Sequence, residues 1–253
     1  MTGPAAHRVA VVAPVACLGA LAVALALSGA DRAVLDSMWD AAESRWWLRD
    51  GLWTDAVLHD GGRRVIQAFA LGLAGWLVLA WTRPSLRAGR PVAGYLLLSL
   101  ALAVGIVNLG KRATTTDCPW SLVRYGGTRP EVGLLEPRPP ALPPGHCFPG
   151  GHSSGGFALL GLYVAARARG WRRAPLWLVP GAGLGVVFAA VQWVRGAHFP
   201  SHDATSAAIC WLVAAGLGRL MLSPPAPSSA PVHGARSPRI ARAGDRAPPP
   251  PPR

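Results

Sequence analysis

Long apolar runs divide this sequence, and they constrain its fold more than any other feature. About six of them approach the roughly 20 residues that an α-helix needs to cross a bilayer. They cover residues 9–27, 65–81, 92–109, 154–168, 176–194 and 204–222. Inside a bilayer the backbone must satisfy its own hydrogen bonds, which favours helices. The sequence therefore predicts an all-α, polytopic membrane protein built as a bundle of about six transmembrane helices.

The arginines between the runs predict which helix ends share a side of the membrane. They cluster at residues 83–90 and 167–173, and further arginines follow residue 235. Because cytoplasmic loops carry an excess of basic residues, we expect these gaps and both termini in the cytoplasm. Residues 31–64, 110–153 and 195–203 then face outward. The alanine- and arginine-rich composition suggests a bacterial protein, which places the chain in the inner membrane with these gaps in the periplasm.

The segments at residues 31–64 and 223–253 lie outside the predicted spans, and each has a composition that predicts its structure. Residues 31–64 mix acids, arginines and four tryptophans, which is typical of a segment lying at headgroup depth. His59 is interpreted there as part of a turn before the second helix. Residues 223–253 are rich in proline, alanine, serine and arginine and are expected to form a disordered cytoplasmic tail. The membrane domain is predicted at residues 1–222; its first run could instead be a signal peptide, but its length favours a retained helix.

Composition argues against several functions. The formal net charge is +13, yet the positive charge lies in short gaps and in the tail rather than on one soluble face. This pattern fits membrane topology and predicts no nucleic-acid partner. Four cysteines without CxxC spacing are too few for a disulfide scaffold and do not match a zinc site. No metal, cofactor or protein partner is predicted, and membrane lipids are the expected surroundings.

The residues suited to catalysis all fall in the outward gaps. Lys111, the only lysine, follows the third run; His152 precedes the fourth, and His198 lies between the fifth and sixth. Ends of neighbouring spans meet in a bundle, so we expect these residues in one pocket at the outer membrane surface. A phosphate needs cations and backbone amides, which Lys111, Arg195 and a glycine-rich helix start near Ser153 can supply. Histidines can attack phosphorus and protonate a leaving alkoxide without a metal.

Three segments carry a family resemblance. Lys111 is followed after six residues by Cys118-Pro119, residues 149–152 read Pro-Gly-Gly-His, and residues 196–203 contain His198 and Asp203. They resemble the three motifs of the phosphatidic acid phosphatase type 2 superfamily of membrane phosphatases: Lys-x6-Arg-Pro, Pro-Ser-Gly-His and Ser-Arg-x5-His-x3-Asp. The likeness spans about residues 110–208. Neighbouring segments resemble a bacterial branch of the family that lacks the usual arginine.

The resemblance implies a role for each matched residue. His198 would be the nucleophile that forms a phosphohistidine, His152 the general acid, and Asp203 the residue that orients His198. The phosphate-binding residues implied are Lys111, Arg195, Gly150, Gly151 and Ser153.

Two departures from the family pattern leave alternatives open. Arg195 lies three residues before His198, and Gln192 occupies the position where the family has its arginine. Asp203 is one residue late, and His202 stands at the expected position. His202 could therefore orient His198 or act as the nucleophile itself. Three further arginines are candidates to replace the missing one: Arg112, Arg124 and Arg129.

The predicted function is metal-independent hydrolysis of a lipid phosphate or diphosphate through a phosphohistidine, at a periplasmic active site. The alternatives are a lipid phosphotransferase that uses the same intermediate and a non-catalytic protein that binds lipid phosphates. Cys118 and Cys147 both flank the expected pocket, and an oxidising periplasm permits a disulfide between them.

Overall fold

The computed structural model describes residues 4–133 and 136–222, and it confirms the all-α fold class. The α-helices among these residues are α1 (Pro4–Ser28), α2 (Ala30–Asp36), α3 (Gly62–Thr82), α4 (Arg90–Ala113), α5 (Gly151–Phe157), α6 (Gly161–Ala168), α7 (Leu184–Val194) and α8 (Pro200–Leu222). The π-helices are η1 (Leu52–Gly61) and η7 (Val179–Gly183). The 3-10 turns are η2 (Pro84–Gly89), η3 (Pro119–Ser121), η4 (Val123–Tyr125), η5 (Ala158–Leu160) and η6 (Ala174–Trp177). A two-stranded ribbon pairs β1 (Trp39–Asp40) with β2 (Arg45–Trp46).

Five helical segments of the described residues are long and apolar enough to cross a membrane. They cover Val11–Ser28, Leu52–Thr82, Pro84–Ala113, Ala174–Val194 and Pro200–Leu222. Large apolar side chains such as Leu71, Val78 and Leu220 are exposed on them, as on surfaces that face lipid. The protein is therefore a multi-pass membrane protein. The predicted tail at 223–253 lies outside the described residues.

The run expected at residues 154–168 differs from the other five. It forms α5 and α6 with the turn η5 between them, and nearly all of its residues up to Gly161 are buried. Its glycines lower helix propensity and permit close packing. This segment is therefore an inner layer of the bundle rather than a lipid-facing span.

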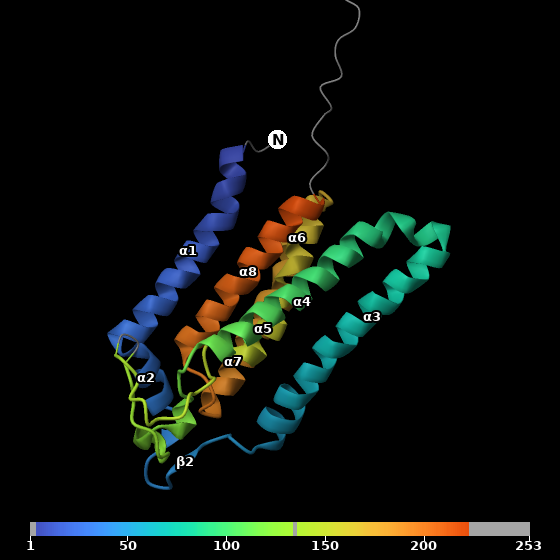
Figure 1. Ribbon diagram of the computed structural model, residues 1–253. Coiled ribbons are helices and arrows are strands. Elements are labelled where there is room, and N and C mark those ends of the chain that lie inside the picture. The colour runs from blue at the N-terminus through green and yellow to red at the C-terminus, as the bar shows by residue number, and fades with distance from the viewer. Residues whose placement is uncertain (1–3, 134–135, 223–253) are drawn as a thin grey trace, which may run out of the picture. The chain divides into compact units, whose positions relative to one another are not determined.

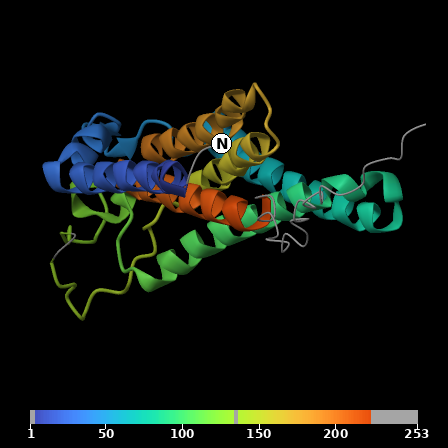
Figure 2. The same ribbon diagram turned by 90° about the horizontal axis from the view of Figure 1, so that it is seen from above.

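Helix α8 forms the centre of the bundle. It packs against α1 on one side and against α4, α5 and α6 on the others (Figure 1). Helices α3 and α4 form an antiparallel hairpin joined by η2, and the η2 end of this hairpin reaches away from α8 (Figure 2). The main hydrophobic core includes Ile66 of α3, Phe157 of α5, Phe188 of α7 and Cys210 of α8.

Segments predicted to face outward pack together at one end of this bundle. A second hydrophobic cluster joins Leu35 of α2, Trp46 of β2, and Leu122 and Tyr125 of the loop after α4. The predicted turn at His59 is wrong, because residues 52–61 form the π-helix η1, which continues directly into α3. The second span thus begins about a dozen residues earlier than its apolar run indicates.

Glycines set the distance between α5 and α7. A Cβ on Gly156 would lie 2.5 Å from the backbone nitrogen of Gly185, and a Cβ on Gly185 would lie 2.2 Å from the ring of Phe157. The two backbones approach as closely as in other small-residue helix contacts in membranes. Any larger residue must push apart the two helices that carry His152 and Gln192.

We predict that Gly156→Ala destabilises the protein by about 1–3 kcal/mol, because the added methyl group overpacks a backbone contact. Gly75→Ala is the matched control, since a Cβ at that helical position meets nothing within 4 Å. Thermal unfolding in detergent should show a lower midpoint for Gly156→Ala and an unchanged or higher midpoint for Gly75→Ala. Equal midpoints for the two variants would contradict the close approach.

Candidate active site

The turn that leads to His198 begins where α7 ends. The Gly196 N–H donates to Trp193 O at 2.9 Å, and the Ala197 N–H donates to Gln192 O at 2.8 Å. These two bonds, with Gly196 at φ 71°, form a Schellman motif, in which glycine adopts the left-handed conformation at little cost. A Cβ on Gly196 would also lie 2.1 Å from the Trp46 ring. Both constraints require glycine two residues before His198.

The other side of this turn is the start of α8. Pro200 is the first residue of the helix, where its missing N–H costs nothing. The carboxylate of Asp31, on α2, accepts the Ser201 N–H at 2.9 Å and the Ser201 hydroxyl at 2.5 Å. A residue 170 positions earlier in the chain thus caps α8 and fixes the position of its first turn, which contains Asp203.

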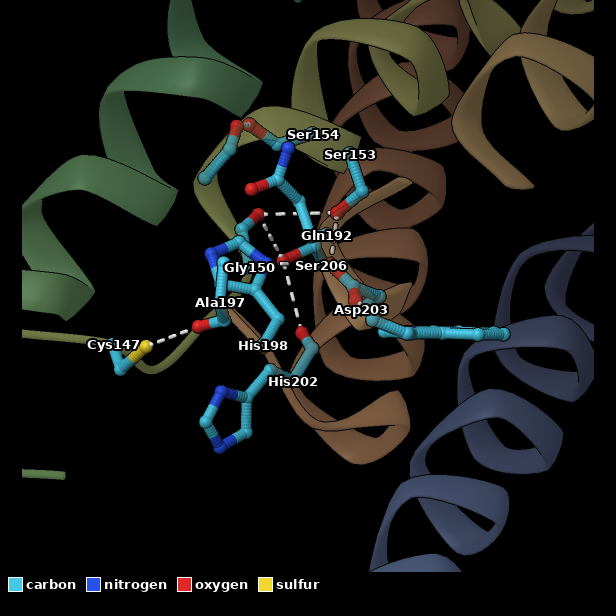
Figure 3. A network of polar contacts seen from close by, with 12 residues as sticks. Cys147, Gly150, Ser153, Ser154, Gln192, Ala197, His198, His202, Asp203 and Ser206 are labelled. Carbon is cyan, nitrogen blue, oxygen red and sulfur yellow. Dashed lines mark hydrogen bonds and ion pairs between the residues drawn. The ribbon is translucent and has the colours of Figure 1, made fainter. Parts of the chain in front are cut away.

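Asp203 lies at the centre of a buried polar network (Figure 3). Its Oδ1 accepts the Ser153 hydroxyl at 2.6 Å and lies 3.1 Å from His198 Nδ1, while its Oδ2 accepts the Trp193 indole N–H at 2.7 Å. With the proton of His198 on Nδ1, the lone pair is on Nε2. The geometry is that of a carboxylate that fixes the tautomer of a nucleophilic histidine. The Ser153 hydroxyl, expected on the phosphate, is here bonded to Asp203.

Gly150 connects this network to α5. Its N–H donates to His202 O at 3.0 Å, and its carbonyl accepts the Ser206 hydroxyl at 2.8 Å, so its backbone is tied to α8 (Figure 3). A Cβ at this position would lie 2.0 Å from Asp203 Oδ1 and 3.0 Å from His198 Nδ1. The serine of the usual motif therefore has no room here, because the carboxylate occupies that space.

His202 contributes its backbone rather than its ring to this network. Its carbonyl accepts the Gly150 N–H, but its imidazole points away from the Asp203 carboxylate (Figure 3). The ring packs edge-on against Phe148 and Phe199, with its centroid 6.2 Å from that of His198. In this arrangement Asp203, not His202, is the partner of His198.

Lys111 approaches the site from the last turn of α4. Its ammonium donates to His146 O at 3.3 Å, and a Cβ on Gly151 would lie 2.7 Å from Lys111 Cε. Glycine at position 151 thus lets the lysine side chain lie against the backbone at the start of α5. The side chain remains partly exposed, so its charge is available to an anion.

His152 is held by the segment that precedes α3. Its Nε2 lies 3.3 Å from Leu58 O, and its ring lies between those of His59 and Phe188, with centroid distances of 4.4 and 4.5 Å. Burial, with the neighbouring imidazole of His59 as the second cause, lowers the pKa of His152 to about 4. His152 is therefore neutral at pH 7 in the absence of substrate.

Three of the four candidate arginines have other partners in this structure. Arg195 forms an ion pair with Asp55 at 2.5 Å. Arg124 pairs with Asp36 of α2 and Arg129 with Asp117 of the loop after α4, while Arg112 is exposed just beyond Lys111. At the family's usual arginine position, Gln192 Nε2 instead lies 2.9 Å from His59 Nδ1. No sequence pattern links His59 or Trp193 to the motifs, so sequence reasoning missed both; Gln192 was identified only as the residue in place of the arginine, without its partner.

A disulfide joins Cys118 and Cys147, as the sequence allowed. Cys118, one half of the bridge, stands where the family's first motif has arginine, so this position supplies no cation. The sulfur of Cys147 also contacts Ala197 O at 2.8 Å, which places the bridge directly against the His198 turn (Figure 3).

We predict that the denatured, unreduced protein contains two reactive thiols, those of Cys17 and Cys210, and that reduction raises the number to four. Alkylation followed by mass spectrometry measures both numbers. Alkylation of Cys118 or Cys147 without prior reduction would contradict the disulfide.

Comparison with known proteins identifies a family. The PAP2 superfamily matches residues 92–222, just over half of the chain's 253 residues and a range that contains all three motifs. No curated protein and no solved structure matches the chain with significance. Members of the matched family are phosphatases, which supports hydrolysis of phosphoric esters. The chain belongs to the PAP2 superfamily.

Proposed function

We propose that the protein is an inner-membrane phosphatase that hydrolyses a lipid phosphate or diphosphate through a phosphohistidine, with its site at the periplasmic face and both termini in the cytoplasm. The observation that carries the proposal is the buried Asp203–His198 pair next to Gly150, Lys111 and His152. A histidine whose Nδ1 is held by a carboxylate presents Nε2 as a nucleophile.

In the first step, His198 Nε2 attacks phosphorus as the bond from phosphorus to the leaving oxygen breaks. His152, which takes up a proton together with the substrate, donates that proton to the leaving oxygen, so the leaving group departs as an alcohol or a phosphate. Because His152 Nε2 is bonded to Leu58 O, the transferred proton comes from Nδ1. Lys111 neutralises charge on the non-bridging oxygens, and the carboxylate of Asp203 stabilises the positive charge on the His198 ring.

In the second step, water attacks the phosphohistidine and the bond from phosphorus to Nε2 breaks. The neutral His152 takes a proton from this water, which restores its protonated state in the substrate complex, and it loses that proton when phosphate leaves. Arg195 lies next to the site but is bonded to Asp55, so its role as a phosphate ligand requires exchange of that partner for the substrate.

One feature supports a lipid as the substrate. Lys111 lies near the end of one span and His198 directly before the start of another. Because the ends of membrane spans lie near the lipid headgroups, a site built from these residues suits a lipid phosphate.

We expect His198→Ala to lower phosphate release by at least about 1,000-fold, because it removes the nucleophile. The assay uses purified protein in detergent with phosphatidic acid, phosphatidylglycerol phosphate and a polyprenyl diphosphate as separate substrates. Wild-type activity should persist in excess chelator, since protein side chains supply all the charges in the proposed steps. An acid-labile phosphohistidine should form in the wild type and be absent from the variant.

The same assay distinguishes the outcomes. Full activity of His198→Ala would rule out His198 as the nucleophile. Complete loss of wild-type activity on chelation would rule out the metal-independent mechanism. Phosphohistidine that reacts with an added acceptor lipid in preference to water would identify a phosphotransferase instead.

We also predict that Gly150→Ser, which restores the family's usual residue, lowers activity at least about tenfold. The new Cβ must displace the Asp203 carboxylate or the His198 ring, because hydrogen bonds to α8 hold the Gly150 backbone. Gly155→Ala, on the helix that Gly150 caps, is the matched control, because a Cβ there makes only an ordinary contact with Ile66. A fully active Gly150→Ser enzyme would show that the carboxylate position is not required.

A further inference from the structure

His59 lies beside the site although no motif contains it. It belongs to η1, and its Nδ1 lies 2.9 Å from the side-chain amide of Gln192, which is 3% exposed. Its ring lies against that of His152, with the centroids 4.4 Å apart and the planes inclined by 45°. One imidazole thus links the general acid of the proposed mechanism to the residue that replaces the family's arginine.

The surrounding structure brings η1 close to His152. Gly62, where η1 passes into α3, has its Cα so near Phe188 that a Cβ would lie 2.6 Å from that ring. Phe188 contacts the His152 ring at a centroid distance of 4.5 Å, and Leu58 O lies 3.3 Å from His152 Nε2. The ring of His152 is therefore enclosed by His59, Phe188 and the Leu58 carbonyl.

We propose that His59, held by Gln192, is a positioning residue that clamps the imidazole of His152 in the orientation needed to protonate the leaving group. This inference rests on the proposed phosphatase function. It assigns a role to Gln192, which stands where the family has an arginine, and to its hydrogen-bond partner His59. Gln192 donates to His59 Nδ1, so the proton of His59 is on Nε2, and the Leu58 carbonyl keeps a proton on His152 Nε2.

The charged and titratable groups around the two rings come from several elements. They are Asp55 and Asp60 of η1, Arg195 at the end of α7, and His198 in the turn before α8. Next to the Arg195 guanidinium, a neutral His59 adds no further charge to the phosphate site. A neutral His152 takes up its proton together with the anionic substrate.

The test uses leaving groups that differ in their need for a proton. An alkoxide from phosphatidic acid requires protonation, whereas nitrophenolate from p-nitrophenyl phosphate leaves without it. We expect His59→Ala to lower kcat for phosphatidic acid about tenfold more than kcat for p-nitrophenyl phosphate. His152→Ala should show the same selectivity with a larger loss, and the double variant should be no slower than His152→Ala, because His59 acts through His152.

Two further variants separate positioning from folding. His59→Phe keeps a ring against His152 but loses the bond to Gln192, so it should show an intermediate loss with the same selectivity. Val57→Ala truncates an exposed residue of the same helix and should leave both activities unchanged. Unfolding midpoints in detergent identify any variant that fails to fold.

Equal losses for the two esters in folded His59→Ala, or a double variant much slower than His152→Ala, would overturn the inference. Wild-type protein that turns over neither ester would overturn the proposed function, and the inference with it. Normal turnover by the wild type with unselective His59 variants would overturn the inference alone.

Discussion

The buried carboxylate of Asp203 is the interaction on which the rest of the site depends. A buried charge costs several kcal/mol unless hydrogen bonds and an opposite charge compensate it. Here Ser153 of α5, Trp193 of α7 and His198 of the turn before α8 all contact its two oxygens. Separating any one of these segments would remove one of the contacts that compensate the buried charge. The same contacts that stabilise the carboxylate therefore hold the proposed nucleophile in place.

Three consecutive residues at the start of α5 link this carboxylate to the remaining groups. Gly150 leaves space for the Asp203 carboxylate, Gly151 leaves space for Lys111, and His152 packs against His59. The geometry also relates two departures from the family pattern. An aspartate one residue later in the chain brings its carboxylate to the place of the usual serine side chain, and glycine at position 150 accommodates it.

Much of the fold and part of the site could be predicted from the sequence. Apolar length predicted about six spans, of which five are helical segments long and apolar enough to cross a membrane among the described residues. Motif order predicted that Lys111, His152 and His198 lie together, because the ends of packed helices meet. The turn predicted at His59 was wrong, since η1 has helical hydrogen bonds that a short polar segment does not indicate. The partners of the arginines could not be predicted, because an ion pair depends on which loops pack together.

The sequence by itself determined the spans, their order and the family, because bilayer thickness and motif spacing are properties of the linear chain. Only the tertiary structure decided which polar groups meet. Ser153 and Asp203 are 50 residues apart, His59 and Gln192 133, and Arg195 and Asp55 140. Hydrogen bonds act over about 3 Å and require specific directions. Such contacts form only after the helices have packed, so no local sequence pattern shows which groups His59, Trp193 and Gln192 will contact.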